Sequence, residues 1–552
     1  MPRSLTILTA ALLFALPEAR AATPTPATDV PASCGTTLAQ KAWMFQGQRG
    51  YFFYGDELSG LWMQRPWAEA RSTFVPGAVR LAATLKARGV TLVLAPVPPR
   101  SFVTPGQLSS ASPAQKAFDT KAAQAFYAGL VADLRAAGVP TADLLTPAVQ
   151  QGDAGLFRQD IHWTPQGAQA AAQAVTATVG TLRLLPSQDA FVSLRSGTVT
   201  RQVQDQPVLG QLATLCGLTV APETYAEYQT RPAGALVAAP GNFGASEGTV
   251  RWAFGPVAGV SYAVKAAGPV TVDATFETPL EGQGVEVRAG GKVLDTIQGL
   301  KRGENVTRRW TVDAAAGGND LEFRFADYNG GRTTFAPGDG RPMAVIFKKL
   351  TVTSSDVTVD LVKGDSAGSG LLAGAADVVL VGASSSLPSL NFAGFLQEGL
   401  GVRVDNVSFG GAGVFSSLKD YLLDDAFTQS RPKVLIWQVP LLGGEDTAEA
   451  DLRFVTAAAL GARGGVTASG TGQVGLDTGN LTPRAVRVHA ADAAVQAVTV
   501  TVTTDSGTRT FRIVNSDRMT HRQDFLLSLD GLGKVKRVDV KASGALTLDV
   551  TP

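Results

Sequence analysis

The stretch "AADVVLVGASSS", residues 375–386, decides the fold class of this chain. Its apolar run ends at Gly382, three serines follow, and the next segment, "LPSLNFAGFLQEGLG", has the apolar spacing of a helix. A buried strand that leads through a tight turn into a helix is typical of α/β proteins. Polar groups in such turns lie at the carboxyl edge of the sheet, where binding and catalytic groups are common. The turn at 382–386 is therefore both a fold signal and a candidate site.

The segments that follow continue the strand and helix alternation. "VRVDNVSFGGAG" (402–413) predicts a second strand with a glycine loop, "SSLKDYLLDDAF" (416–427) a helix and "PKVLIWQVP" (432–440) a third buried strand. This set is too small to close a domain alone. We expect it to complete the α/β pattern of the N-terminal half.

The N-terminal half supplies the remaining α/β segments. Residues 74–88 and 113–137 have helical periodicity, "GVTLVLAPVPPRS" (89–101) reads as a buried strand, and "GVPTADLL" (138–145) as a short strand. We therefore predict one three-layer α/β domain with a parallel sheet, assembled from residues 34–225 and 363–447.

Two further regions are β-rich and surround the second half of this domain. Residues 226–362 hold short alternating segments between Gly, Asn and Asp turns, which predicts an inserted β-sandwich or jelly roll. Residues 448–552 alternate in the same way and predict a C-terminal β-rich domain. Each is a candidate carbohydrate-binding module, and we expect the C-terminal one to be dispensable for chemistry on a small ester.

The N-terminus predicts export. Residues 1–21 carry Arg3, an apolar run and the small-residue pattern Ala19-Arg20-Ala21, which is typical of a signal peptide, and a retained membrane anchor is the alternative. Residues 22–33 form a Pro/Thr/Ala linker. We expect a periplasmic or secreted protein.

The two cysteines and the net charge limit which covalent bonds and binding partners we expect. Export permits a disulfide between Cys34 and Cys216, with two buried free thiols as the alternative. The net charge of +1 argues against a nucleic-acid partner. We expect no metal. We also expect no cofactor, because no Gly-rich loop has the pattern that binds the phosphates of acetyl-CoA.

The segment "RQDIHWTPQGAQ", residues 158–169, contains one of only 3 histidines. Thr164 is placed to cap a helix that begins at Pro165, so Asp160 and His162 fall in the loop before its N-terminus. A neutral histidine activates a serine hydroxyl when an acid fixes its tautomer. Asp160 and His162 are thus the candidate acid and base.

The partner of this pair is predicted at the turn after the apolar strand. Ser384 fits the position of the nucleophile, but the pattern alone does not choose between it and the neighbouring Ser385 and Ser386. The backbone amides of Ser384 and of Gly411, in the next glycine loop, are candidates for an oxyanion hole.

Other residues allow two interpretations each. Trp252 and Trp310 would stack on sugars or, more commonly, pack in a core. Arg100 would bind a polar substrate or sit at a solvated loop end. We interpret His489 and His521 as structural, in β segments without catalytic partners.

In combination these segments resemble the SGNH-hydrolase superfamily, and most closely the SGNH-like proteins of the periplasmic alginate O-acetyltransferase family. "DIHW" (160–163) is similar to the family's Asp-x-His-Trp block, "GQRGYFFYGDEL" (47–58) to its N-terminal block and "VGASS" (381–385) to its Gly-x-Ser block. The order, with the histidine block before the serine block, also matches. Asn406 and Gly411 resemble the second block. The third block departs, since Gln438 stands in a strand where an asparagine is usual.

The resemblance implies an exported polysaccharide O-acetyltransferase. Ser384 would carry the acetyl group as an ester, with His162 as base and Asp160 as its orienting acid. It also implies a polysaccharide acceptor and a membrane-bound O-acyltransferase as acetyl source. A carbohydrate acetylesterase with the same triad is the first alternative. A non-catalytic glycan-binding component of an export complex is the second, and its signature would be a broken triad.

Overall fold

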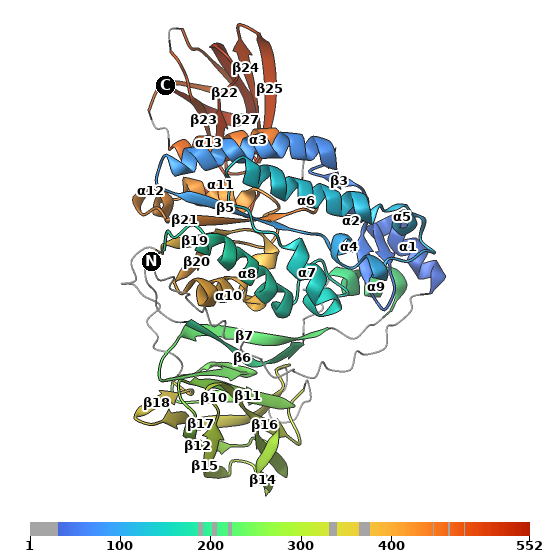
Figure 1. Cartoon of the computed structure of the whole chain (residues 1–552), viewed down its shortest axis with the longest axis vertical. Helices are drawn as coiled ribbons and strands as arrows, with labels where there is room; N and C mark the ends of the chain where they lie inside the picture. The colour runs from blue at the N-terminus through green and yellow to red at the C-terminus, as the bar shows by residue number, and fades with distance from the viewer. Residues whose placement is uncertain are drawn as a thin grey trace, which may run out of the picture.

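The computed structural model describes residues 31–185, 191–200, 207–218, 223–330, 339–363, 376–444, 446–461, 464–479 and 481–552. The predicted signal peptide at 1–21 and residues 22–30 of the predicted linker lie outside the described residues. Figure 1 shows an α/β layer in the middle of the molecule, with one β region on either side of it. None of the helices in the described segments is long and apolar enough to cross a membrane.

The middle layer is built on a four-stranded parallel sheet, as the sequence predicted. The strand order is β20-β19-β21-β5, with every neighbouring pair parallel. The strands are β20 (Val404–Asn406), β19 (Val378–Val381), β21 (Val434–Pro440) and β5 (Thr91–Val97). An isolated parallel bridge from Leu94 to Thr141 extends the sheet beyond β5. One strand from before the inserted β region and three strands from after it therefore make one sheet.

Helices cover both faces of this sheet (Figure 1). One apolar core lies on the side of α3 (Trp67–Lys86), α6 (Thr120–Ala136), α11 (Ser416–Leu423) and α13 (Ala448–Leu460). The other lies on the side of α8 (Pro165–Gly180) and α10 (Phe392–Leu400). The short helices are α2 (Gly55–Leu58), α4 (Arg100–Val103), α5 (Pro113–Ala117), α7 (Leu145–Gln151) and α12 (Asp425–Gln429). The helix expected over 113–137 is thus broken, because Asp119 caps α6 by accepting a hydrogen bond from the amide of Ala122.

A small separate core holds the N-terminal segment in place. It forms between α1 (Ala32–Ala42), β1 (Met44–Gln46), β2 (Phe52–Tyr54) and α9 (Pro207–Cys216). The hairpin β3 (Leu61–Trp62) and β4 (Arg65–Pro66) follows. Cys34 on α1 is bonded to Cys216 on α9, which confirms the predicted disulfide. The bridge spans 182 positions and, in the chain-entropy view, stabilises the fold by about 5 kcal/mol.

Strands β8 to β18 form two facing antiparallel sheets. One has the order β15-β12-β17-β10-β9, with β18 on β17, and the other β14-β13-β16-β11-β8. The strands are β8 (Leu236–Gly241), β9 (Phe243–Ser246), β10 (Arg251–Phe254), β11 (Val257–Val264), β12 (Gly268–Glu277), β13 (Gln283–Ala289), β14 (Lys292–Leu300), β15 (Asn305–Ala314), β16 (Gly317–Phe325), β17 (Met343–Ser354) and β18 (Val357–Asp360). Their alternating inward residues share one core, which is the arrangement of a sandwich.

A two-stranded ribbon lies between this sandwich and the α/β layer (Figure 1). Its strands are β6 (Phe191–Thr200) and β7 (Thr224–Pro232), paired antiparallel. The predicted border at 225/226 falls within β7. The ribbon contacts α10 through Thr230 and Asn391, and its apolar residues Val192 and Leu194 pack on the sandwich.

The C-terminal region forms one antiparallel sheet of order β25-β24-β27-β23-β26, with β22 on β27. The strands are β22 (Val466–Asp477), β23 (Ala485–Ala490), β24 (Ala497–Thr504), β25 (Gly507–Val514), β26 (Asp524–Ser528) and β27 (Val535–Thr551). The predicted border at 447/448 coincides with the first residue of α13. This helix lies between α3 and the C-terminal sheet, and residues of all three belong to one apolar core. The two regions therefore share their interior, which the sequence did not indicate.

Candidate active site

Three side chains distant in sequence form a hydrogen-bonded chain at the carboxyl edge of the parallel sheet. The Nδ1 atom of His162 lies 2.7 Å from Oδ2 of Asp160, and its Nε2 atom lies 2.6 Å from Oγ of Ser384. The Asp160 carboxylate is buried, and its other oxygen accepts a hydrogen bond from the amide of Ile161. With Nδ1–H donating to Asp160, the lone pair of Nε2 faces the serine hydroxyl. The arrangement is that of a serine activated by a histidine and an acid.

The geometry also separates the three neighbouring serines. Ser384 is partly exposed and faces His162. The carbonyl of Ser385 accepts a hydrogen bond from Nε1 of Trp163, and the Ser386 hydroxyl is fully buried. Among the three, only Ser384 has an accessible hydroxyl within hydrogen-bond distance of the His162 imidazole. Ser384 is therefore the candidate nucleophile that the geometry favours over Ser385 and Ser386.

The local fold aims the loop of Asp160 and His162 at the serine turn. Leu156 and Trp163 form an antiparallel bridge that closes the loop. Thr164 caps α8 by accepting from the amide of Gly167, and Pro165 is the first helical residue, as predicted. The Trp163 indole links this loop to the turn after β19, because its Nε1 donates a hydrogen bond to the carbonyl of Ser385. Its ring also packs on Phe392 of α10. Trp163 thus fixes the spacing between base and nucleophile.

The serine turn is held from the neighbouring strands. The Oε1 atom of Gln438, on β21, accepts a hydrogen bond from the amide of Ala383 at 3.0 Å. A side chain at Gly382 would meet Gln438 at 2.4 Å, so only glycine fits there. Gln438 is fully buried, and it supports the turn instead of facing substrate. Asn406, at the end of β20, donates to the carbonyl of Ser386 from the other side.

The glycine loop after β20 contacts the C-terminal domain. Gly411 has a φ of 75°, a conformation that favours glycine. Arg518, from the loop between β25 and β26, donates a hydrogen bond of 2.5 Å to the carbonyl of the adjacent Gly410. In the same loop, the amides of Thr520 and His521 donate to Asp420 of α11. The C-terminal domain therefore holds the segment in which the second oxyanion donor is predicted.

Arg100 is buried, which contradicts both interpretations made from the sequence. Its guanidinium forms an ion pair of 2.7 Å with Glu57, and the two side chains are 0% and 1% exposed. It also donates to the carbonyls of Phe52 and Arg158. Burial alone would lower the pKa of Arg100, but attraction to Glu57 raises it above its ordinary value, and Asp160 acts in the same direction. Arg100 therefore connects the N-terminal glycine–aromatic segment to the loop of Asp160.

Replacing Arg100 by methionine is expected to destabilise the protein by about 3–5 kcal/mol, since it leaves Glu57 charged and buried without its partner. The double variant Arg100→Met/Glu57→Leu should recover part of this loss. Arg71→Ala is the matched control, because its ion pair with Asp133 is half exposed and should contribute less than about 1 kcal/mol. Urea unfolding measures all three, and a double variant less stable than Arg100→Met would contradict the assignment.

The structure also changes the interpretation of two histidines and one tryptophan that the sequence singled out. His489 and His521 do have acidic partners, since Nδ1 of each lies about 3 Å from Asp524 or Asp420 respectively. His489 lies in β23 as predicted, whereas His521 lies in the loop between β25 and β26 and not in a β segment. No contact in the described part of the chain joins either histidine to a serine hydroxyl. Trp310 is buried in the sandwich core and donates to Asp295, which excludes it as an exposed sugar platform. Across the described residues there is no cluster of His, Cys, Asp or Glu suited to a metal.

With this geometry in view, comparison with known proteins identifies the family. Residues 44–251 and 327–441, more than half of the chain, match the SGNH hydrolase-like domain of the acetyltransferase AlgX. The chain belongs to this family. The resemblance drawn from the Asp-x-His-Trp and Gly-x-Ser segments is thereby confirmed.

Curated relatives carry names from alginate biosynthesis. The chain is 26% identical over 360 residues to the alginate biosynthesis protein AlgX of Pseudomonas putida, covering 64% of this chain and 48% of that protein. It is 31% identical over 151 residues to the probable alginate O-acetylase AlgJ of Pseudomonas aeruginosa, covering 26% and 35%. The matched segments thus span less than half the length of these relatives.

A solved structure shows the same fold. Pseudomonas aeruginosa AlgX superposes with a TM-score of 0.53 at 18% identity, covering 92% of this chain and 94% of that one. The SGNH-like parallel sheet accompanied by additional β-sheets is therefore a shared architecture.

Proposed function

We propose that this protein transfers an acetyl group onto hydroxyls of a polysaccharide through an ester on Ser384. The observation that carries the proposal is the continuous hydrogen-bonded chain from Asp160 through His162 to Ser384. Membership of the AlgX family supports the acetyl group as the cargo, and the alginate-related names of the curated relatives support a polysaccharide as the acceptor. A non-catalytic role would have been favoured by a broken triad, and the three side chains are in contact.

The chemistry follows from these contacts. Oγ of Ser384 bonds to the acetyl carbonyl carbon while its proton moves to Nε2 of His162, and Asp160 stabilises the imidazolium. The tetrahedral oxyanion would be held by the amides of Ser384 and Gly411. His162 gives its proton to the leaving group of the donor, which leaves acetyl-Ser384. A sugar hydroxyl then loses its proton to His162, attacks the ester and releases the Ser384 hydroxyl.

The donor and the location are further parts of the proposal. The donor would be an acetylated membrane-bound O-acyltransferase, and the protein would act after export. The two β regions would hold the polymer while the ester reacts. No cofactor is assigned, because the ester exchange needs only the donor, the triad and the acceptor hydroxyl.

Turnover of a chromogenic acetyl ester by the pure protein tests the proposal, with and without oligosaccharide acceptors. Transfer is expected to appear as acetylated oligosaccharide detected by mass spectrometry, in competition with hydrolysis. Release of acetate alone at every acceptor concentration would favour the acetylesterase. Absence of both products from a folded protein would overturn the catalytic assignment.

Arg518 offers a test of the second oxyanion donor. Arg518→Ala removes the hydrogen bond to Gly410 and should lower kcat on the small ester by about tenfold with KM little changed, because a loosened donor acts on the transition state. Arg522→Ala is the matched control, since Arg522 donates to Asp517 within its own loop. Both variants should melt like the parent protein. An equal kcat for the Arg518 and Arg522 variants would contradict the role of this contact.

A further inference from the structure

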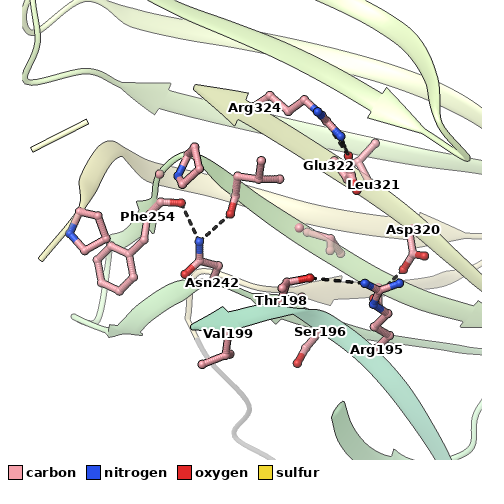
Figure 2. Close-up of a pocket in the computed structure, with 18 residues that line it drawn as sticks. Arg195, Ser196, Thr198, Val199, Asn242, Phe254, Asp320, Leu321, Glu322 and Arg324 are labelled. Carbon is pink, nitrogen blue, oxygen red and sulfur yellow. Dashed lines mark hydrogen bonds and ion pairs between the residues drawn. The ribbon is translucent and has the colours of Figure 1, made fainter. Parts of the chain in front are cut away.

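We infer that a groove between the β6–β7 ribbon and the inserted sandwich binds an uncharged saccharide. The space measures about 680 Å³, within the range of small-molecule sites. It is lined by β6 on one side and by β11 and β16 on the other, and we call it the ribbon groove (Figure 2). It contains none of the triad residues. The choice of ligand class rests on the proposed polysaccharide acceptor, whereas the existence of the groove does not.

The strand register explains why this sheet face is open and polar. Gly259 and Ser261 of β11 stand opposite Glu322 and Asp320 of β16. Because alternate residues of a strand point to opposite faces, these four share the outer face of the sheet, while the buried Val260 faces the sandwich core. Gly259 has no side chain to fill the groove at this point of the sheet. A side chain there would meet only the carbonyl of Leu321, at 3.5 Å, and would otherwise extend into the groove.

The β6 strand of the ribbon forms one side of the groove and is held against the sandwich by close backbone contact. The carbonyl of Ser196 lies so close to Gly241 of β8 that no side chain fits between them. Beside this contact, the register of β6 shifts between Arg195 and Gly197. Farther along the same outer face, Leu194 packs against Val237 and Ala239. The apolar end of the face is thus covered by the ribbon, and the polar end remains open.

The side chains that face the groove carry both signs of charge in equal number. Arg195 and Arg324 are balanced by Asp320 and Glu322, and Figure 2 shows Arg195 and Asp320 facing each other from β6 and β16. Such a site favours a ligand without net charge. A polyuronate gains no net attraction from this lining, because Arg324 is already paired with Glu322 and Arg195 is balanced by Asp320, while its carboxylates must still lose water on binding.

The groups available match vicinal sugar hydroxyls. Oδ1 of Asp320 accepts from the Ser261 hydroxyl at 2.7 Å, and a carboxylate has about four acceptor positions, so others remain for a ligand. Arginine supplies donors in a planar fork. The half-buried ring of Phe254 lines the far end and can cover the apolar face of a sugar. Acceptors, donors and one ring surface together describe a saccharide site.

The test measures binding to the full-length protein carrying Ser384→Ala, so that bound sugar is not modified. The probes are cellohexaose, mannohexaose and a mannuronate hexamer, in separate calorimetric titrations. At least one neutral hexaose should bind more tightly than the uronate. In the same background, Gly259→Val should weaken that binding at least about tenfold, since it fills part of the groove without changing charge. Asp320→Asn should weaken it severalfold.

Gly318→Val is the matched control, since Gly318 lies near the start of β16, does not line the groove and has open space around it. It should leave binding within about twofold, and all variants should melt together. If Gly259→Val fails to fold, Arg195→Ala replaces it. Equal binding by Gly259→Val and Gly318→Val, or no binding of either neutral hexaose, would overturn the site. Tighter, Gly259-dependent binding of the uronate would overturn the uncharged ligand.

Turnover separates this inference from the proposed function. With Ser384 restored, Gly259→Val should hydrolyse a small acetyl ester at the parent rate. Loss of saccharide binding with normal ester turnover supports both conclusions. Normal binding in a protein without ester turnover would contradict the catalytic proposal and leave the groove intact.

Discussion

Ester turnover is expected to fall by about three to six orders of magnitude when Ser384 is replaced by alanine. The hydroxyl 2.6 Å from His162 is then lost, and only transition-state binding by the remaining site contributes. His162→Ala should cause a loss of similar size. Asp160→Asn should cost about 10³–10⁴-fold, because an amide no longer stabilises the imidazolium or fixes its tautomer. Steady-state kinetics on a chromogenic acetyl ester measures each variant.

The neighbouring serine provides the control for this experiment. Ser385→Ala leaves the carbonyl that accepts from Trp163 in place and should retain most of the activity. The double variant Ser384→Ala/His162→Ala should be no worse than either single variant, because the residues act as a unit. Near-normal turnover by a folded Ser384→Ala protein would remove this serine from the mechanism.

Removal of residues 448–552 is expected to abolish folding, not merely binding to polymer. The sequence suggested that the α/β part would work alone, but α13 lies between α3 and the C-terminal sheet with most of its residues buried. Deletion would expose the face of α3 on which Gly77 meets Leu452 of α13, together with the apolar core that the two helices share. A surface of this kind leads to aggregation. Size-exclusion chromatography and circular dichroism of the truncated protein give the readout, and a folded, active monomer would contradict the shared core.

Point variants test the same interface without truncation. Gly77 on α3 approaches Leu452 on α13 so closely that a side chain at Gly77 would lie 2.5 Å from it. Gly77→Ala and Leu452→Ala should each destabilise the protein, the latter by about 2–5 kcal/mol. The double variant should be more stable than the sum predicts, because the smaller Leu452 site accommodates the added methyl group. Strict additivity in urea unfolding would show that the two helices are not in contact.

Several features were decided by local sequence. The apolar strand ending at Gly382 and the alternation around it predicted the parallel sheet, since a fully buried strand needs a continuous apolar run. Thr164 and Pro165 predicted the start of α8 because capping depends on neighbouring residues only. The pairing of Asp160 with His162 could be predicted for the same reason, because both residues belong to one short loop.

Other features arise from contacts between distant segments. Arg100 reads as a loop arginine, and only the fold places it against Glu57 in the interior. Gln438 departs from the expected asparagine, yet in the structure it supports the amide of Ala383. The acid partners of His489 and His521 come from positions 35 and 101 residues away. No local periodicity encodes such pairs.

By itself, the sequence determined the parallel α/β core, the β character of the two added regions and the candidate triad, because each depends on periodicity, turn chemistry or a short motif. It also limited any disulfide to Cys34 and Cys216, because the chain has only two cysteines, but it left two free thiols as the alternative. Only the tertiary structure decided which serine meets His162, that α13 joins two regions into one core, and that a polar groove opens beside β6. These depend on how strands and helices pack across hundreds of residues. Packing is set by shape and burial in three dimensions, which a one-dimensional pattern does not specify.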